Sequence, residues 1–116
     1  MDSSVYQLLE EQGFDVEGTM KRFLNNDALY MKCLKKFLDD KSFEVLKESL
    51  ENGNCEEAFK AAHTMKGFVS NLGINKLYEV VSPMVEKLRT GNMDIADEMQ
   101  KMEALYKSTY ELIEKL

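Results

Sequence analysis

The sequence has few residues that interrupt helices and an excess of acidic over basic residues. It contains one proline, six glycines and no tryptophan among 116 residues. So little proline and glycine excludes a loop-rich or collagen-like chain. Asp and Glu outnumber Lys and Arg by 21 to 15, which gives a formal net charge of −6. This balance argues against a nucleic-acid-binding protein, because phosphate contacts need clustered Lys and Arg.

Long hydrophobic runs and targeting features are also absent. No apolar run approaches the ~18 residues of a transmembrane helix, so we expect no membrane partner. Residues 1–4 lack the basic and apolar regions of a signal peptide, and we expect a cytoplasmic protein in which Met1 starts a complete short chain. Cys33 and Cys55 have no metal-ligand spacing and are interpreted as reduced packing residues.

The remaining residues favour helices, with eight methionines and many Leu, Glu, Lys and Ala. Two short amphipathic helices are predicted within residues 1–25. Ser3 or Ser4 can cap the first helix, and Gly13 ends it. The apolar face of the second helix is formed by Val16, Met20, Phe23 and Leu24.

Four longer amphipathic segments follow, and Asp27 is a good N-cap for the first of them. The polar run at 39–42 predicts a kink or break in that segment, and Pro83 predicts a local kink without a helix end in the third. The long segments are expected at about 28–52, at 55–72 with Gly73 as the stop, from 74 to a stop at 90–92, and from about 94 to the C-terminus.

Connections of two or three residues between these segments imply that neighbouring helices are antiparallel. We therefore predict one all-α domain over residues 1–116. Residues 27–116 should form an antiparallel up-and-down four-helix bundle. The one or two short helices of residues 1–25 should pack across that bundle.

His63, the only histidine, should lie on the outward face of the 55–72 helix. With about 100° per residue, an apolar face lies opposite, formed by Ala58, Ala61, Ala62, Met65, Phe68, Val69 and Leu72. The residues within about 60° of the histidine are Glu56, Phe59, Lys60, Lys66, Gly67 and Ser70. His63 is therefore either an incidental surface histidine or a reactive group that faces a partner.

The neighbours of His63 favour a reactive group. Gly67 lies mid-helix, where glycine costs about 0.5–1 kcal/mol relative to alanine, and a missing side chain would let another protein approach closely. Lys66 and Lys60 could hold a phosphoryl oxygen on His63 or pair with acids on a partner. Simple solvation is the alternative, and we keep it for Lys60. Phe59 suits a docking surface or packs against a neighbouring helix.

Other chemistries at this histidine lack the residues that they require. A single histidine excludes a histidine-rich metal site, and no glycine-rich loop precedes a helix to hold a nucleotide. Ser70 is not placed to use His63 as a base, and no acid is placed to orient the ring. An enzyme with His63 as general base is the weakest hypothesis. What remains is an imidazole that accepts a group and passes it on.

The motif at 62–67, Ala-His-Thr-Met-Lys-Gly, followed by Leu72-Gly73, resembles the signature of the histidine-containing phosphotransfer (HPt) domains of multistep two-component phosphorelays. The resemblance extends from about Asn26 to the C-terminus. It includes the Asn-Asp-x-x-Tyr start of the first long helix and the Gly-Asn before the histidine helix.

The resemblance implies a phosphocarrier that is neither a kinase nor a phosphatase and binds no ATP. His63 would accept a phosphoryl group at Nε2 from an aspartyl phosphate on a receiver domain and pass it to a second receiver aspartate. Lys66 would hold the phosphoryl group, and Gly67 would keep the approach open. The chain would carry no metal or other cofactor, because the receiver supplies the Mg²⁺.

The resemblance also implies partners, namely response-regulator receiver domains and a hybrid sensor histidine kinase, with the chain itself a monomer. Candidate docking residues are Phe59, Lys60 and Ser70. The family usually has a small residue where this chain has Phe68, which the wheel places at the border of the core. An inward Phe68 would leave the site open, and an outward one would alter partner access. The alternative function is a non-phosphorylated helical adaptor that binds a receiver or kinase.

Overall fold

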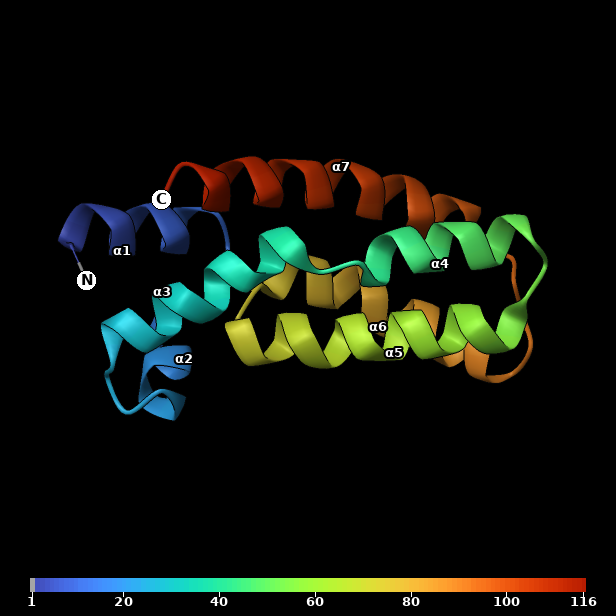
Figure 1. Cartoon of the computed structure of the whole chain (residues 1–116), viewed down its shortest axis with the longest axis horizontal. Coiled ribbons are helices and arrows are strands. Elements are labelled where there is room, and N and C mark those ends of the chain that lie inside the picture. Colours follow the sequence, from blue (N-terminus) through green and yellow to red (C-terminus); the bar gives the residue numbers. More distant parts are fainter. Residues whose placement is uncertain (1) are drawn as a thin grey trace.

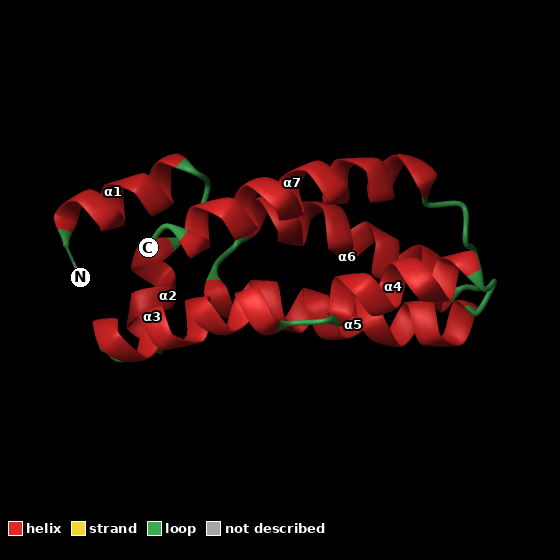
Figure 2. Cartoon of the chain, turned by 45° about the horizontal axis from the view of Figure 1, so that its top comes forward, coloured by secondary structure: helices red, strands yellow, loops and turns green. Residues whose placement is uncertain are grey.

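The structure is a computed structural model that describes residues 2–116, so Met1, where the predicted domain begins, lies outside the described residues. Over residues 2–116 the chain is all-helical and contains no β-strand, which confirms the predicted fold class (Figure 2). The elements are α1 (Ser3–Glu11), α2 (Val16–Arg22), α3 (Asp27–Lys36), the 3₁₀ helix η1 (Phe37–Asp39), α4 (Ser42–Glu51), α5 (Cys55–Leu72), α6 (Asn75–Arg89) and α7 (Ala96–Glu114).

The long axis of the molecule is followed back and forth by successive helical segments (Figure 1). The first is the series α3, η1 and α4, and the others are α5, α6 and α7. Helix α4 packs against α5, α5 against α6 and α6 against α7, while η1 contacts α7. The extents of 44 × 24 × 21 Å reflect this elongated arrangement.

The predicted break in the first segment is confirmed. Helix α3 ends at Lys36, one 3₁₀ turn follows, and Asp40 adopts an extended backbone with ψ of 135°. The Asp40 carboxylate then accepts hydrogen bonds from the backbone N–H and the hydroxyl of Ser42, at 3.2 and 3.1 Å. The break changes the direction of the chain. Phe37 before the break and Phe43 after it are therefore both buried.

Within residues 2–116, one hydrophobic core lies between these segments and extends to residues of α1 and α2. Helix α6 contributes much of it and continues through Pro83, as predicted. The largest side chains that are almost completely buried are Tyr30, Phe37, Leu9, Leu34, Leu46, Met65, Leu72, Ile74, Leu77, Met84, Ile95 and Met102. Helix α5 is thus held along its inner face, while its outer face stays at the surface.

Two predicted N-caps are wrong by one or two residues. Asp2, not Ser3 or Ser4, caps α1, because its carboxylate accepts the backbone N–H of Ser4 at 2.7 Å. Asn26, not Asp27, caps α3 through its side-chain oxygen. In both places two good capping residues adjoin, and the preceding one has the extended backbone that a cap requires.

The predicted apolar face of the second short helix is wrong at its last member. Helix α2 ends at Arg22, and Leu24 lies beyond it with a φ of 53° and 87% of its surface exposed. The two short helices lie at one end of the molecule, α1 towards the C-terminal end of α7 and α2 beside α3 (Figure 1). That they pack across a four-helix bundle stays a prediction.

Candidate functional site

Helix α5 has well-defined ends that match the predicted bounds. Asn54 caps it by accepting the backbone N–H of Glu57 at 3.1 Å, and the acidic Glu56 and Glu57 in the first turn suit the positive end of the helix dipole. Gly73 ends the helix with a φ of 73°. Of the predicted apolar face all but Phe68 is buried, which fixes the rotation of the helix about its axis.

The carbonyl groups at the C-terminal end of α5 are satisfied by side chains from the N-terminal segment. The Arg22 guanidinium donates to the carbonyls of Ser70 and Asn71, at 3.1 and 3.0 Å. The buried Tyr30 hydroxyl donates to the carbonyl of Leu72 at 3.0 Å, and burial raises the pKa of this phenol. The Ser70 carbonyl also accepts the backbone N–H of Gly73 at 3.2 Å, and a cation at this end of the helix suits the helix dipole. The contacts hold α5 at one end.

Gly73 brings α2 into direct contact with this end of α5. The backbone N–H of Asp15 donates to the Gly73 carbonyl at 2.9 Å. A Cβ atom at Gly73 would overlap the Thr19 hydroxyl and lie 2.8 Å from the Asp15 carbonyl oxygen. Glycine is required here for close approach as well as for its left-handed backbone.

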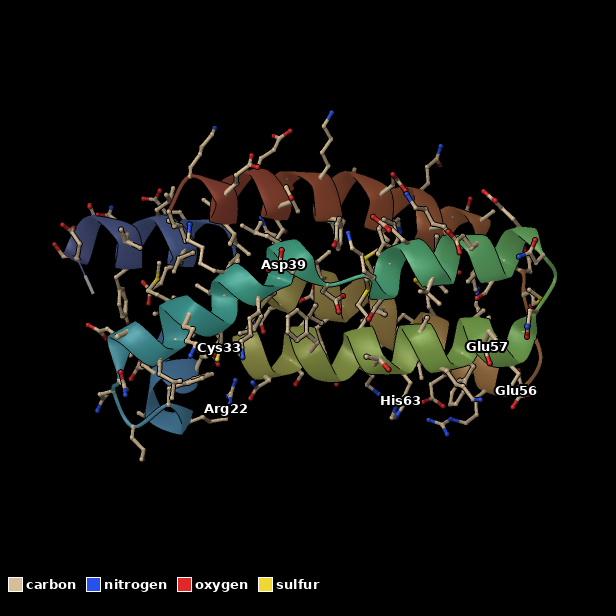
Figure 3. All side chains as sticks on the ribbon, viewed as in Figure 1. Arg22, Cys33, Asp39, Glu56, Glu57 and His63 are labelled. Carbon is tan, nitrogen blue, oxygen red and sulfur yellow. The ribbon has the colours of Figure 1, made fainter. Side chains whose placement is uncertain are left out.

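His63 is exposed in the middle of α5 and projects away from the other helices (Figure 3). The outward orientation predicted from the helical wheel is therefore confirmed. The ring of Phe59, one turn earlier, lies 5.7 Å from the imidazole between centroids, at an interplanar angle of 35°. The guanidinium of Arg89 from α6 lies 5.0 Å from the centre of the same Phe59 ring. The half-buried Phe59 side chain is thus near both the His63 imidazole and the Arg89 guanidinium.

Gly67 lies one turn after His63 in open space. It is exposed, and no atom lies within 4 Å of the position that a Cβ would occupy. Its φ is not positive, so an L-residue fits the backbone there. Packing against a neighbouring helix, the structural alternative for this glycine, is therefore excluded. Its effect is to leave one flank of the imidazole uncovered.

The two lysines near His63 lie in different environments. Lys66 is half-buried, with its Nζ atom 6.0 Å from the centre of the Tyr78 ring of α6. Lys60 is exposed and pairs with Glu56 and Glu57 of its own helix, each at 3.5 Å. These carboxylates, Glu57 first, raise the pKa of Lys60. Lys60 is thus an exposed residue that pairs within its own helix, whereas Lys66 lies near an aromatic ring of α6.

Phe68 turns inward, which decides between the two alternatives left by the sequence. Its ring is nearly parallel to that of the buried Phe37, at 8° and 6.2 Å between centroids. Phe68 therefore fills space beside the core and leaves the His63 side of α5 open. Ser70 is exposed, while its backbone carbonyl is held by Arg22.

Sequence reasoning missed the α6 side of this site. Tyr78 and Arg89 are 11 residues apart, which is close to three helical turns and places both on one face of α6. That spacing was the available signal, but it becomes informative only once α6 is known to lie beside the outward face of α5.

His63 lies on the exposed side of α5. A shallow groove of about 340 Å³ runs between α4 and α5, with Val45, Ala61 and Thr64 in its lining. In the part of the chain that the structure describes, no three His, Cys, Asp or Glu side chains are grouped as a metal site. None of the helices within residues 2–116 combines the length and apolarity needed to cross a bilayer. The arrangement presents an imidazole on an open surface.

Comparison with known families agrees with this geometry. The family model of the Hpt domain matches residues 35–114, well over half of the chain. No curated protein and no solved structure matches the sequence with comparable significance. Hpt domains are carriers in histidine phosphotransfer within phosphorelays. The chain therefore belongs to the Hpt domain family.

Proposed function

We propose that this protein is a phosphocarrier that accepts a phosphoryl group on His63 from the aspartyl phosphate of a receiver domain and passes it to the aspartate of a second receiver. The observation that carries the proposal is an exposed imidazole at the centre of a firmly held helix, with Lys66 on one side and the uncovered Gly67 on the other. We interpret residues 27–116 as an antiparallel up-and-down four-helix bundle that serves as the support for this helix.

The chemistry is a displacement at phosphorus. The lone pair of the unprotonated imidazole nitrogen, Nε2 in our proposal, forms a bond to phosphorus. The bond from phosphorus to the aspartyl oxygen breaks, and the carboxylate leaves with the electron pair. The other ring nitrogen then releases its proton to solvent, and transfer to the second receiver reverses these steps. The chain acts as a carrier without a cofactor of its own, and the receiver contributes Mg²⁺.

Lys66 supplies positive charge beside the transferred group. Lys66 follows His63 by three residues on α5, and its ammonium group lies 6.0 Å from the centre of the Tyr78 ring. We propose that the ammonium group moves from this place to donate a hydrogen bond to a phosphoryl oxygen on His63.

The receiver approaches on the side that Gly67 leaves open. A receiver must bring its aspartate within bonding distance of the imidazole, and any side chain at position 67 would stand in that path. We propose that Lys60, Ser70 and the exposed edge of Phe59 form the rim that the receiver contacts. The groove between α4 and α5 continues this surface.

Transfer of radiolabelled phosphate tests the proposal. The purified protein is mixed with each phosphorylated receiver of its host, alongside a control carrier. We expect label on the wild-type protein from at least one receiver and none on the His63→Gln variant. Absence of label from every receiver, while the control carrier accepts it, would refute the proposal. Receiver binding without transfer, unchanged in His63→Gln, would indicate the adaptor instead.

A further inference from the structure

Three side chains form a row along the seam between α5 and α6. The imidazole of His63 packs on the ring of Phe59, and the guanidinium of Arg89 lies over that same ring. Phe59 and His63 are one turn apart on α5, whereas Arg89 comes from the last turn of α6. Phe59 thus contacts both the nucleophile and a cation from another helix.

The end of α6 is fixed beside the start of α5, which sets the order of this row. The Cys55 thiol, in the first turn of α5, donates to the carbonyl of Leu88 at 3.5 Å. Phe59 is one turn beyond Cys55 and His63 one turn further, so Arg89, which follows Leu88, comes from the part of α6 that lies beside the start of α5. Arg89 is itself held by Glu86, with 3.4 Å between Nε and Oε2.

We infer that Phe59 is a positioning residue that selects the orientation of the His63 imidazole for phosphoryl transfer, and that Arg89 holds Phe59 in place. The inference rests on the proposed function. An exposed histidine on a helix otherwise samples more than one χ1 well and a broad range of χ2. Contact with an aromatic ring favours one orientation, so a larger share of molecules presents the reacting nitrogen to the donor.

A docking role for Phe59 gives a different expectation. A residue that only contacts the receiver affects transfer from the receiver and has no effect with a small donor. A residue that orients the imidazole affects both donors. Phosphoramidate is a suitable small donor, since its P–N bond breaks, ammonia leaves with the electron pair, and the imidazole nitrogen bonds to phosphorus and its ring loses a proton.

The variants are Phe59→Leu and Arg89→Gln, with Arg89→Lys as the conservative change that keeps a cation. The chain offers a matched control in Lys47→Gln on α4. Lys47 also lies over a phenylalanine ring, that of Phe43, at 4.9 Å, and also pairs with a glutamate at 3.4 Å. Circular dichroism melting curves establish that each variant is folded. Arg89 and Lys47 are surface residues, so their variants should fold. They test the positioning role even if Phe59→Leu is unstable.

Two readouts decide the matter. With either donor, Phe59→Leu should be phosphorylated about two- to tenfold more slowly than wild type. The phosphorylation rate of Arg89→Gln should fall about twofold, while Arg89→Lys and Lys47→Gln keep the wild-type rate. As the only histidine, His63 also gives a single set of imidazole signals in a ¹H–¹³C NMR spectrum. These signals should shift in Phe59→Leu and Arg89→Gln but not in Lys47→Gln.

The remaining outcomes distinguish failure of the positioning role of Phe59 from failure of the carrier function. Loss of transfer from the receiver alone would make Phe59 a docking residue. Unshifted imidazole signals in Phe59→Leu would show that the rings do not interact in solution. Either result overturns the inference and leaves the carrier function standing. If neither donor phosphorylates the wild-type protein, the proposed function fails, whereas the NMR comparison still decides whether Phe59 orients His63.

Discussion

Replacement of Gly67 by alanine should make the protein more stable and a poorer phosphate acceptor. Alanine in a helix interior is more favourable than glycine by about 0.5–1 kcal/mol. No atom lies within 4 Å of the added Cβ, so no steric cost reduces this gain. For a domain of this size, the gain should raise the melting midpoint by roughly 2–5 °C.

The larger Gly67→Val change separates the two effects. Valine has a poorer helix propensity than alanine, so the free energy of unfolding should stay within about 0.5 kcal/mol of wild type. Its branched side chain would stand in the path of the receiver, and transfer should slow by about tenfold or more, which corresponds to about 1.4 kcal/mol in the activation free energy.

Urea unfolding followed by circular dichroism and transfer kinetics from a phosphorylated receiver measure the two quantities. Ala104→Gly is the matched control, because Ala104 is exposed on α7, away from the α5 surface. It should lose about 0.5–1 kcal/mol of stability and keep the wild-type transfer rate. A destabilised Gly67→Ala protein, or an unchanged transfer rate in Gly67→Val, would refute the reasoning.

Three further predictions concern other parts of the molecule. Lys66→Ala should slow the formation of phosphohistidine, or shorten its lifetime, by about tenfold. Uptake and retention of the label measure the two rates. If neither rate changes, Lys66 plays no part in holding the phosphoryl group. Arg22→Met removes two hydrogen bonds to the end of α5 and should lower the free energy of unfolding in urea by about 1–2 kcal/mol. An unchanged urea midpoint would show that hydrogen bonds to solvent replace them. Burial raises the pKa of Tyr106 from 10.0 to about 12. The folded state thus holds this proton more tightly than the unfolded chain does, so stability is full below pH 10 and falls as the pH rises towards 12. Tyr106→Phe should lessen this alkaline loss in unfolding curves, and an identical loss in both proteins would contradict the assignment.

The sequence was sufficient for features that depend on local periodicity. The bounds of α5, the outward direction of His63 and the break near Asp40 all follow from the spacing of apolar and polar residues along one segment. Helix caps were less certain, because Asn26 and Asp27 are adjacent and both are good capping residues. The role of His63 as the phosphorylated residue stays a prediction.

Contacts between distant segments could not be predicted in the same way. The inward direction of Phe68 depends on where Phe37 lies after the chain bends, and a wheel drawn for one helix contains no information about its neighbour. The contact between Arg89 and Phe59 likewise depends on the register of α6 against α5.

The hydrogen bonds at the end of α5 have a consequence for where this fold begins. The match to the family model starts at residue 35, yet Arg22 and Tyr30, which complete the end of the histidine helix, precede that point. A chain shortened to residues 35–114 would keep the whole family match and lose these side-chain donors, so we expect the last turn of α5 to be held less firmly. The smallest unit that preserves the contacts at the end of the histidine helix is therefore longer than the unit by which the family is identified.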